Sequence, residues 1–380
     1  MYRSNRAFIV IAVAVAAVCD QARAQAQAQA AVPTAAAPTD TIPKITFGGF
    51  IDGYYAFDFN RPATFDRAYT TQPARHNEFN VNLAFIEAKV DAPGYRGRLA
   101  LQTGTSVQSN YAGEPRNGSV SGPNLSRLIQ EAFVGVKVAD NLWVDGGVFL
   151  SHIGMESFIS RDNPMYTRSL VADYSPYYES GARLTWQPSP TLTAIAVVVN
   201  GWQNISETNA AKSVGVHLDY ALTPSITYTY FNYFGDEAPD SAASHEYRFY
   251  NGLGLKGSIT SALQVMAEAD YGRQGHARDT STSAWYGGML TGRYQATPLA
   301  ALIARIERYD DRDQTIIPTG SAFGLRANGL SLGIDVAPQP HVTWRTELRG
   351  LRGDNAVFPK GVAGSSTGDT FIVTSLGLTF

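Results

Sequence analysis

Residues 371–380, the last ten of the chain, read FIVTSLGLTF and show the pattern that decides the fold. Ile372, Leu376, Leu378 and Phe380 occupy one set of alternate positions, while the other set is mostly small or polar. Successive side chains of a β-strand point to opposite faces, so a period of two predicts a strand with one apolar face.

The same alternation recurs along most of the chain. No window after residue 44 approaches the roughly eighteen continuous apolar residues of a membrane helix. One apolar and one polar face per strand suit either a soluble sandwich, with the apolar face inside, or a membrane barrel, with that face against lipid. Clear examples are residues 45–57, 213–220, 263–271 and 342–349.

The lengths of the connections separate the two architectures. Short and long connections alternate, which is typical of outer-membrane barrels and has no reason in a sandwich. Seven short and eight long connections predict an all-β fold: a transmembrane, antiparallel, up-and-down β-barrel of about 16 strands, wide enough for an aqueous channel. The short connections are expected at 92–95, 140–141, 188–190, 222–224, 256–259, 296–298 and 337–340, and the long ones at 61–76, 106–125, 151–175, 202–211, 235–245, 273–282, 311–326 and 353–368.

The amino-terminal segment has the features of an export signal. Arg3 and Arg6 precede an apolar run of about a dozen residues, and small residues follow at cleavage spacing. We therefore expect a signal peptide over 1–24, a flexible Ala/Gln- and Pro-rich linker over 25–44, and the barrel over 45–380. A lipoprotein signal at Cys19 is an alternative, although lipoprotein processing favours a residue smaller than Val18 before the cysteine.

Composition excludes several other classes. One Cys and six scattered His argue against a disulfide framework and against a metal site, and nothing indicates a cofactor. The formal net charge is −3, and loss of three arginines and one aspartate with the signal would leave −5, which gives no reason to expect nucleic acid. Only 17% of residues are charged, as suits a surface that faces lipid.

Closure of a barrel requires the first strand to pair with the last, because unpaired backbone groups are costly in hydrocarbon. The next strand is out of phase: Val81, Leu83 and Phe85 share a parity with Glu87 and Lys89. A β-bulge at 84–86 would restore the pattern. Tyr and Trp near many strand ends favour a membrane through aromatic girdles, although aromatic residues favour strands in any protein.

Charged residues of the polar strand faces should line the lumen, since they would be costly against lipid. The alternative is that most of them only pair across strands. The predicted pore-lining residues are Asp52, Arg183, Arg248, Arg293, Arg305, Arg345, Glu347 and Arg349, and Lys256 and Asp335 share the inward parity.

The third long connection, 151–175, is the best candidate for a pore constriction. Its acidic residues opposite wall arginines would produce a transverse field that favours polar solutes, and the net charge of −5 would favour cations weakly. A solvent-exposed external loop is the alternative. The predicted constriction residues are Glu156, Arg161, Asp162, Arg168 and Asp173.

Two regions give the chain a resemblance to a known family. The opening strand FGGFIDGYY (47–55), and the motifs GME (154–156), YTRSL (166–170) and GARL (181–184), are similar to those of the OmpL-like family of β-barrel porins. The resemblance covers nearly the whole barrel and implies a bacterial outer-membrane protein. In general porins the third loop folds into the channel, and porins of this size are often trimers, so a homotrimer is also implied.

The function expected from these observations is passive diffusion of small hydrophilic solutes and ions through a water-filled channel, with outer-membrane lipid around the barrel and no enzymatic activity. A plugged structural or adhesive barrel is the first alternative. An outer-membrane hydrolase is the second, but the histidines are isolated and a Gly-x-Ser-x-Gly elbow is absent from the sequence.

Overall fold

A computed structural model describes residues 42–276 and 281–380. These residues form a closed antiparallel barrel of sixteen strands, in which each strand pairs with its neighbours in the chain. The predicted signal peptide, 1–24, and nearly all of the predicted linker, 25–44, lie outside the described residues. Among the described residues, no helix combines the length and the apolar character that crossing a membrane requires.

A tilted membrane strand needs about nine to eleven residues, and every barrel strand except β7, with 8 residues, has at least nine. The barrel strands are β1 (Lys44–Asp58), β2 (Phe79–Asp91), β3 (Tyr95–Thr103), β4 (Ile129–Ala139), β5 (Leu142–Leu150), β6 (Tyr178–Ser189), β7 (Leu192–Val199), β8 (Ser213–Thr223), β9 (Ile226–Asp236), β10 (Tyr247–Ser258), β11 (Leu263–Gly275), β12 (Thr282–Thr297), β13 (Ala300–Asp311), β14 (Leu325–Gln339), β15 (Val342–Gly353) and β18 (Gly368–Thr379).

Short helices and one small hairpin lie in the long connections. The helical segments are α2 (Thr105–Asn110), α3 (Pro123–Ser126), the 3-10 turn η1 (Ser160–Asp162) and α4 (Leu170–Asp173). The hairpin consists of β16 (Phe358–Lys360) and β17 (Gly364–Ser366).

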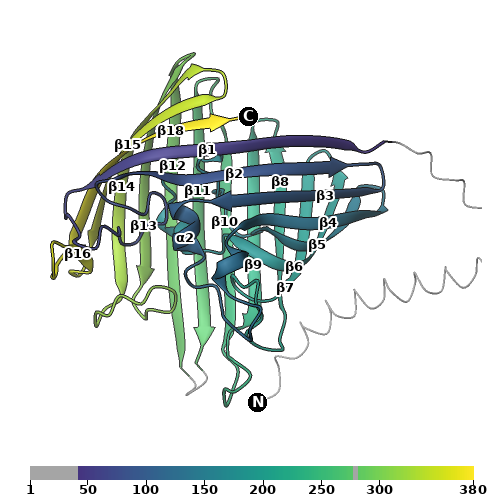
Figure 1. Cartoon of the computed structure of the whole chain (residues 1–380), viewed down its shortest axis with the longest axis horizontal. Coiled ribbons are helices and arrows are strands. Elements are labelled where there is room, and N and C mark those ends of the chain that lie inside the picture. The colour runs from purple at the N-terminus through teal and green to yellow at the C-terminus, as the bar shows by residue number, and fades with distance from the viewer. Residues whose placement is uncertain (1–41, 277–280) are drawn as a thin grey trace, which may run out of the picture. The chain divides into compact units, whose positions relative to one another are not determined.

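The barrel closes between its first and last strands, as predicted. β1, purple in Figure 1, lies beside β18, yellow, with Phe50 opposite Thr379 and Asp58 opposite Phe371. The Gly49 amide donates to the Phe380 carbonyl (2.9 Å), and the Phe380 amide donates to the Gly49 carbonyl (3.1 Å). No barrel strand is therefore left with a free edge among the described residues.

Connections alternate in length as expected. Strand pairs such as β4 and β5 are joined by two residues, 140–141, whereas β5 and β6 are separated by residues 151–177. All the short connections thus lie at one end of the barrel and all the long ones at the other. We call these the short-turn end and the long-loop end.

The two faces of the wall differ as the period of two predicts. On β18, Leu376 is 59% exposed, whereas Phe371 and Val373 are fully buried inside. The outer surface carries rows of exposed Leu, Ile and Val, and the inner face carries most of the charged strand residues.

β2 contains the predicted bulge, but at Asn82 and not at 84–86. The register of β1 and β2 shifts where Asp52 pairs with Leu83 and Gly53 pairs with Val81, which makes Asn82 the extra residue. Leu83 and Phe85 therefore point inward together with the polar residues that follow. Their side chains are shielded from water there, because they pack in a buried cluster with α2 and with the loop at 151–177.

Candidate functional site

The connection between β5 and β6, residues 151–177, enters the barrel; we call it the inner loop. Its backbone and side chains bond to inward-facing residues of strands that are far apart around the wall. The Met155 amide donates to Glu268 on β11 (2.9 Å), and the Ser160 hydroxyl donates to Asp52 on β1 (2.7 Å). The inner loop therefore extends across the lumen.

The loop has a local fold that its own side chains build. Ser169 caps α4, since its hydroxyl accepts from the Ala172 amide (3.4 Å). The Glu156 carboxylate in turn accepts from the Ser169 amide (2.8 Å) and hydroxyl (2.5 Å). These bonds join the two ends of the loop at the start of the helix.

Two buried side chains of the wall hold Thr167. Arg305 on β13 donates to the Thr167 carbonyl (2.5 Å) and to its Oγ1 (2.8 Å). Glu347 on β15 accepts from the Thr167 amide (2.8 Å) and hydroxyl (2.7 Å). Every polar group of Thr167 is thus bonded to a charged side chain. Such hydrogen bonds are about twice as strong as those between neutral groups.

A second charged pair holds the next turn of the loop. Glu307 on β13 accepts from the Leu170 amide (2.7 Å), and Arg349 on β15 lies 2.7 Å from the same carboxylate. Both charged side chains are buried. Together, Arg305, Glu307, Glu347 and Arg349 form what we call the clamp.

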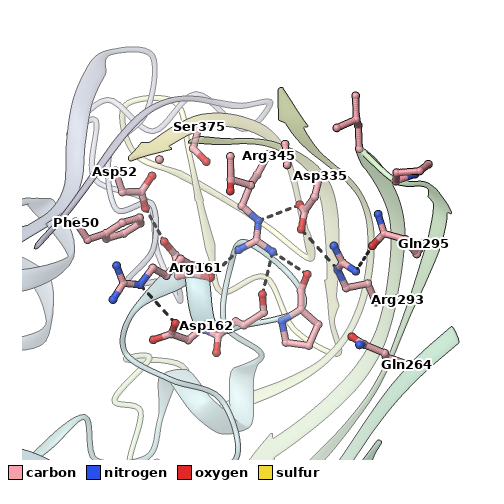
Figure 2. A pocket seen from close by; sticks show the side chains of 18 residues that line it. Phe50, Asp52, Arg161, Asp162, Gln264, Arg293, Gln295, Asp335, Arg345 and Ser375 are labelled. Carbon is pink, nitrogen blue, oxygen red and sulfur yellow. Dashed lines mark hydrogen bonds and ion pairs between the residues drawn. The ribbon is translucent and has the colours of Figure 1, made fainter. Parts of the chain in front are cut away.

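Arg345 on β15 holds the loop nearer the short-turn end, as Figure 2 shows. Its guanidinium donates to the carbonyls of Ser160 (2.6 Å) and Pro164 (2.7 Å), and to Asp335 on β14 (2.9 Å). On the opposite side of η1, Asp52 accepts from Ser160 and from Asn82 (2.9 Å). The turn is therefore fixed between β1 and β15.

A cavity of about 470 Å³ lies between η1 and the wall at the short-turn end, and we call it the vestibule. Arg161 and Asp162 lie on the Phe50 side of it, Arg293 and Asp335 lie on the other side, and Arg345 lies between them (Figure 2). A neighbouring cavity of about 390 Å³ shares Asp162 and Arg293 with it and adds Lys256. The side chains of Arg161 and Arg293 are each 26% exposed and that of Asp162 is 49% exposed, so their charges meet water.

The five loop residues predicted for the constriction divide into two groups. Arg161 and Asp162 line the vestibule. Glu156, Arg168 and Asp173 are buried and build the loop instead. The Arg168 guanidinium stacks 3.9 Å above the Tyr177 ring, whose hydroxyl donates to Asp173 (2.6 Å). Burial raises the pKa of the Asp173 carboxyl, and the nearby Arg168 partly opposes that rise.

The predicted pore-lining residues all face inward, but with different surroundings. Asp52, Arg345 and three clamp residues, Arg305, Glu347 and Arg349, contact the inner loop and are buried by it. Arg293 lines the vestibule.

The last two predicted pore-lining residues lie away from the inner loop's clamp. Arg183 pairs with Asp145 (3.0 Å), which also binds Arg96 (2.7 Å). Arg248, toward the long-loop end, donates to Gln274 (2.8 Å) and lies over the Trp202 ring.

Sequence reasoning missed the neutral part of the site. Gln264, Gln295 and Ser375 line the vestibule. The inward parity of their strands could have identified all three, since each is polar at a position facing the lumen. No group of three or more His, Cys, Asp or Glu side chains in the described ranges is placed to hold a metal ion.

Similar solved structures share the fold. The outer-membrane channel DcaP of Acinetobacter baumannii has a TM-score of 0.62 at 11% identity, over 89% of this chain and 97% of that chain. The anion-selective porin from Comamonas acidovorans has a TM-score of 0.58 at 12% identity, over 89% and 100%. OmpT of Vibrio cholerae has a TM-score of 0.58 at 7% identity, over 90% and 98%.

None of the curated protein sequences compared with the chain matches it. A family model does: the one described as "Putative beta-barrel porin-2, OmpL-like" matches residues 44–380, the whole barrel. The closed sixteen-stranded wall with an apolar exterior and a charged interior agrees with that match. The chain therefore belongs to the OmpL-like β-barrel porin family and is a porin of the bacterial outer membrane.

Proposed function

We propose that small polar solutes and ions cross this porin along the vestibule, with the inner loop as the element that narrows the channel. The clamp and Arg345 fix the loop between distant strands, so Arg161 and Asp162 of the loop line the vestibule together with Arg293 of the wall. The observation that supports this most is the partial exposure of these three charged side chains beside a cavity that glutamine, serine and threonine side chains also line.

We further propose a weak preference for anions. The exposed charges beside the vestibule and its neighbouring cavity include three cations, Arg161, Lys256 and Arg293, against Asp162 and the largely covered Asp335. Selectivity is set by the charges that a permeating ion passes, not by the net charge of the chain. We therefore expect the charges beside these two cavities to outweigh the weak cation preference that the net charge of −5 suggests. The similar porin from Comamonas acidovorans is described as anion-selective.

We also propose a homotrimer and transport without chemistry on the solute. A trimer form of OmpT of Vibrio cholerae is among the similar structures, with a TM-score of 0.57 and 9% identity. A channel acts through pore width and field, and needs no nucleophile.

Planar-bilayer recording with purified, folded protein tests the proposal. We expect discrete conductance steps and, in a tenfold KCl gradient, a small reversal potential of the sign that indicates chloride preference. Detergent without protein is the control. Complete absence of steps from protein that circular dichroism shows to be folded would contradict a diffusion channel, and a potential of opposite sign would contradict the assignment of the vestibule charges.

A further inference from the structure

Arginines interrupt the apolar outer surface at the long-loop end of three neighbouring strands. Along β13 the outward positions run from Leu302 through Ile306 to Arg308. On β14, which begins at the long-loop end, Arg326 precedes the exposed Leu330 and Leu332. On β15 the outward residue at this height is Arg352, which is exposed. Charged side chains on the lipid side of a wall are unusual and call for a partner.

These arginines lie at the level of the outer aromatic girdle. Tyr294 and Tyr286 face outward at the two ends of β12, and Tyr286 stands directly opposite Asp310, which pairs with Arg326 on the next strand. Tyr294 follows Tyr286 by eight positions, which span about 26 Å along the strand, or about 20 Å of membrane height at the usual tilt. The arginines are therefore at the headgroup level of the outer leaflet.

One carboxylate gathers three of the guanidinium groups. Asp310 lies 3.4 Å from Arg308, 3.8 Å from Arg312 and 3.1 Å from Arg326, and is itself only 2% exposed. Asp354 pairs with Arg326 from the next connection (3.2 Å).

Positive charge remains in excess and exposed. Arg352 on β15 is the cross-strand partner of Asn328 on β14. The side-chain carbonyl of Asn328 accepts a hydrogen bond from Arg308 (3.0 Å). Four arginines against Asp310 and Asp354 leave a charge of +2. The side chains of Arg308, Arg312 and Arg326 are 32–59% exposed, so guanidinium edges cover the central carboxylate. The carboxylate of Asp313, the residue after Arg312, accepts a hydrogen bond from the Ala284 amide on β12 (3.4 Å).

We propose that this arginine patch, Arg308, Arg312, Arg326 and Arg352, binds the phosphate groups of lipopolysaccharide, the phosphorylated glycolipid of the outer leaflet. Arginine offers a planar, bidentate donor set that matches phosphate. The rows of Ile306 and Leu330 just below would contact the acyl chains of the same lipid molecule. A soluble anion would match the charge but not these adjoining apolar rows.

Native mass spectrometry of the detergent-solubilised protein with diphosphoryl lipid A tests the proposal. The probes are lipid A and the same lipid after removal of its phosphates. The variant R308Q/R326Q/R352Q is compared with R61Q/R116Q/R127Q, which removes the same charge from the long connections at 59–78 and 104–128. Each basic residue near an anionic headgroup contributes about fivefold in affinity, so we expect about a hundredfold weaker lipid A binding in the first variant only.

Three results would overturn the proposal. The first is equal lipid A binding by the two variants, and the second is equal binding of phosphorylated and dephosphorylated lipid by the wild type. The third is a change of oligomer mass in R308Q/R326Q/R352Q with lipid A binding retained, which would make the patch a contact with a second copy. Heat-modifiable mobility on gels confirms that both variants are folded, and bilayer conductance, which does not involve the patch, serves as an independent control.

Discussion

Two segments of the inner loop carry similar charges and differ in what surrounds them. Around Thr167 the clamp is dry: Arg305 and Arg349 are fully buried, and their partners are loop backbone and carboxylates. Around Arg161 and Asp162 the charges meet water in the vestibule. The first segment fixes where the loop lies, and the second provides the field that a solute experiences.

The difference shows that inward parity alone does not assign a role to a charged residue. Arg293 and Arg305 point into the same barrel from neighbouring strands. Arg305 is covered by the loop, where an unpaired charge would be costly, whereas Arg293 remains solvated and screened. Substitutions in the two places should therefore affect different measurements.

The largest effect is expected for Arg305→Ala. Arg305 lies 3.4 Å from Glu347, 3.5 Å from Glu307 and 3.7 Å from Glu156, and the substitution leaves these carboxylates without their shared cation. Removing one partner of a buried network costs about 3–5 kcal/mol, so we expect a loss of this size in the free energy of unfolding. Urea unfolding in detergent, followed by tryptophan fluorescence, measures it. Arg293→Ala is the matched control and should lose less than about 1 kcal/mol. Equal losses in both variants would remove the distinction between clamp and vestibule.

A smaller effect, in selectivity and not in stability, is expected for Arg161→Gln combined with Arg293→Gln. Loss of two solvated cations beside the vestibule should shift the permeability ratio toward cations by about twofold to threefold. The reversal potential in a KCl gradient measures this shift. Arg308→Gln, on the outer wall, provides the matched control. An unchanged ratio in the double variant would show that ions do not pass these side chains.

The smallest effect is expected for Asp173→Asn, which removes a titrating group from the dry segment. Because the folded chain raises the pKa of Asp173, it binds the proton more tightly than the unfolded chain does. Its contribution to stability therefore falls as pH rises from about 3.9, the unfolded value, to the higher folded pKa. Asparagine cannot titrate, so it should remove this part of the pH dependence. Urea unfolding at several pH values measures the slope, and an unchanged slope contradicts the assignment.

Much of the wall could be predicted from sequence because lipid imposes a simple rule. An outward residue must be apolar and the next must face the lumen, so segments such as 371–380 reveal their faces directly. The alternation of connection lengths then provides strand number and closure. Both depend on local sequence and on the membrane, and neither requires knowledge of contacts between distant residues.

The path of the inner loop could not be predicted in the same way, because it depends on hydrogen bonds between wall side chains and backbone groups of the loop. Arg345 binds the carbonyls of Ser160, Asn163 and Pro164, and carbonyl groups carry no sequence signal. Leu83 and Phe85 seemed out of phase because apolar residues were expected outside, whereas α2 and the inner loop cover them inside. On the inner face, loops that cover the wall thus allow apolar residues at positions where a water-filled lumen would favour polar ones.

The pairing of Gly49 with Phe380 also limits the order in which the chain can assemble. The first strand of the wall, β1, finds its second neighbour only in β18, which is the barrel strand most distant from it in the sequence. Until then β1 presents an open row of backbone donors and acceptors, the kind of edge that recruits foreign strands. Contacts so distant in sequence are slow to form. Shielding of β1 until β18 arrives would therefore limit pairing of this edge with other chains.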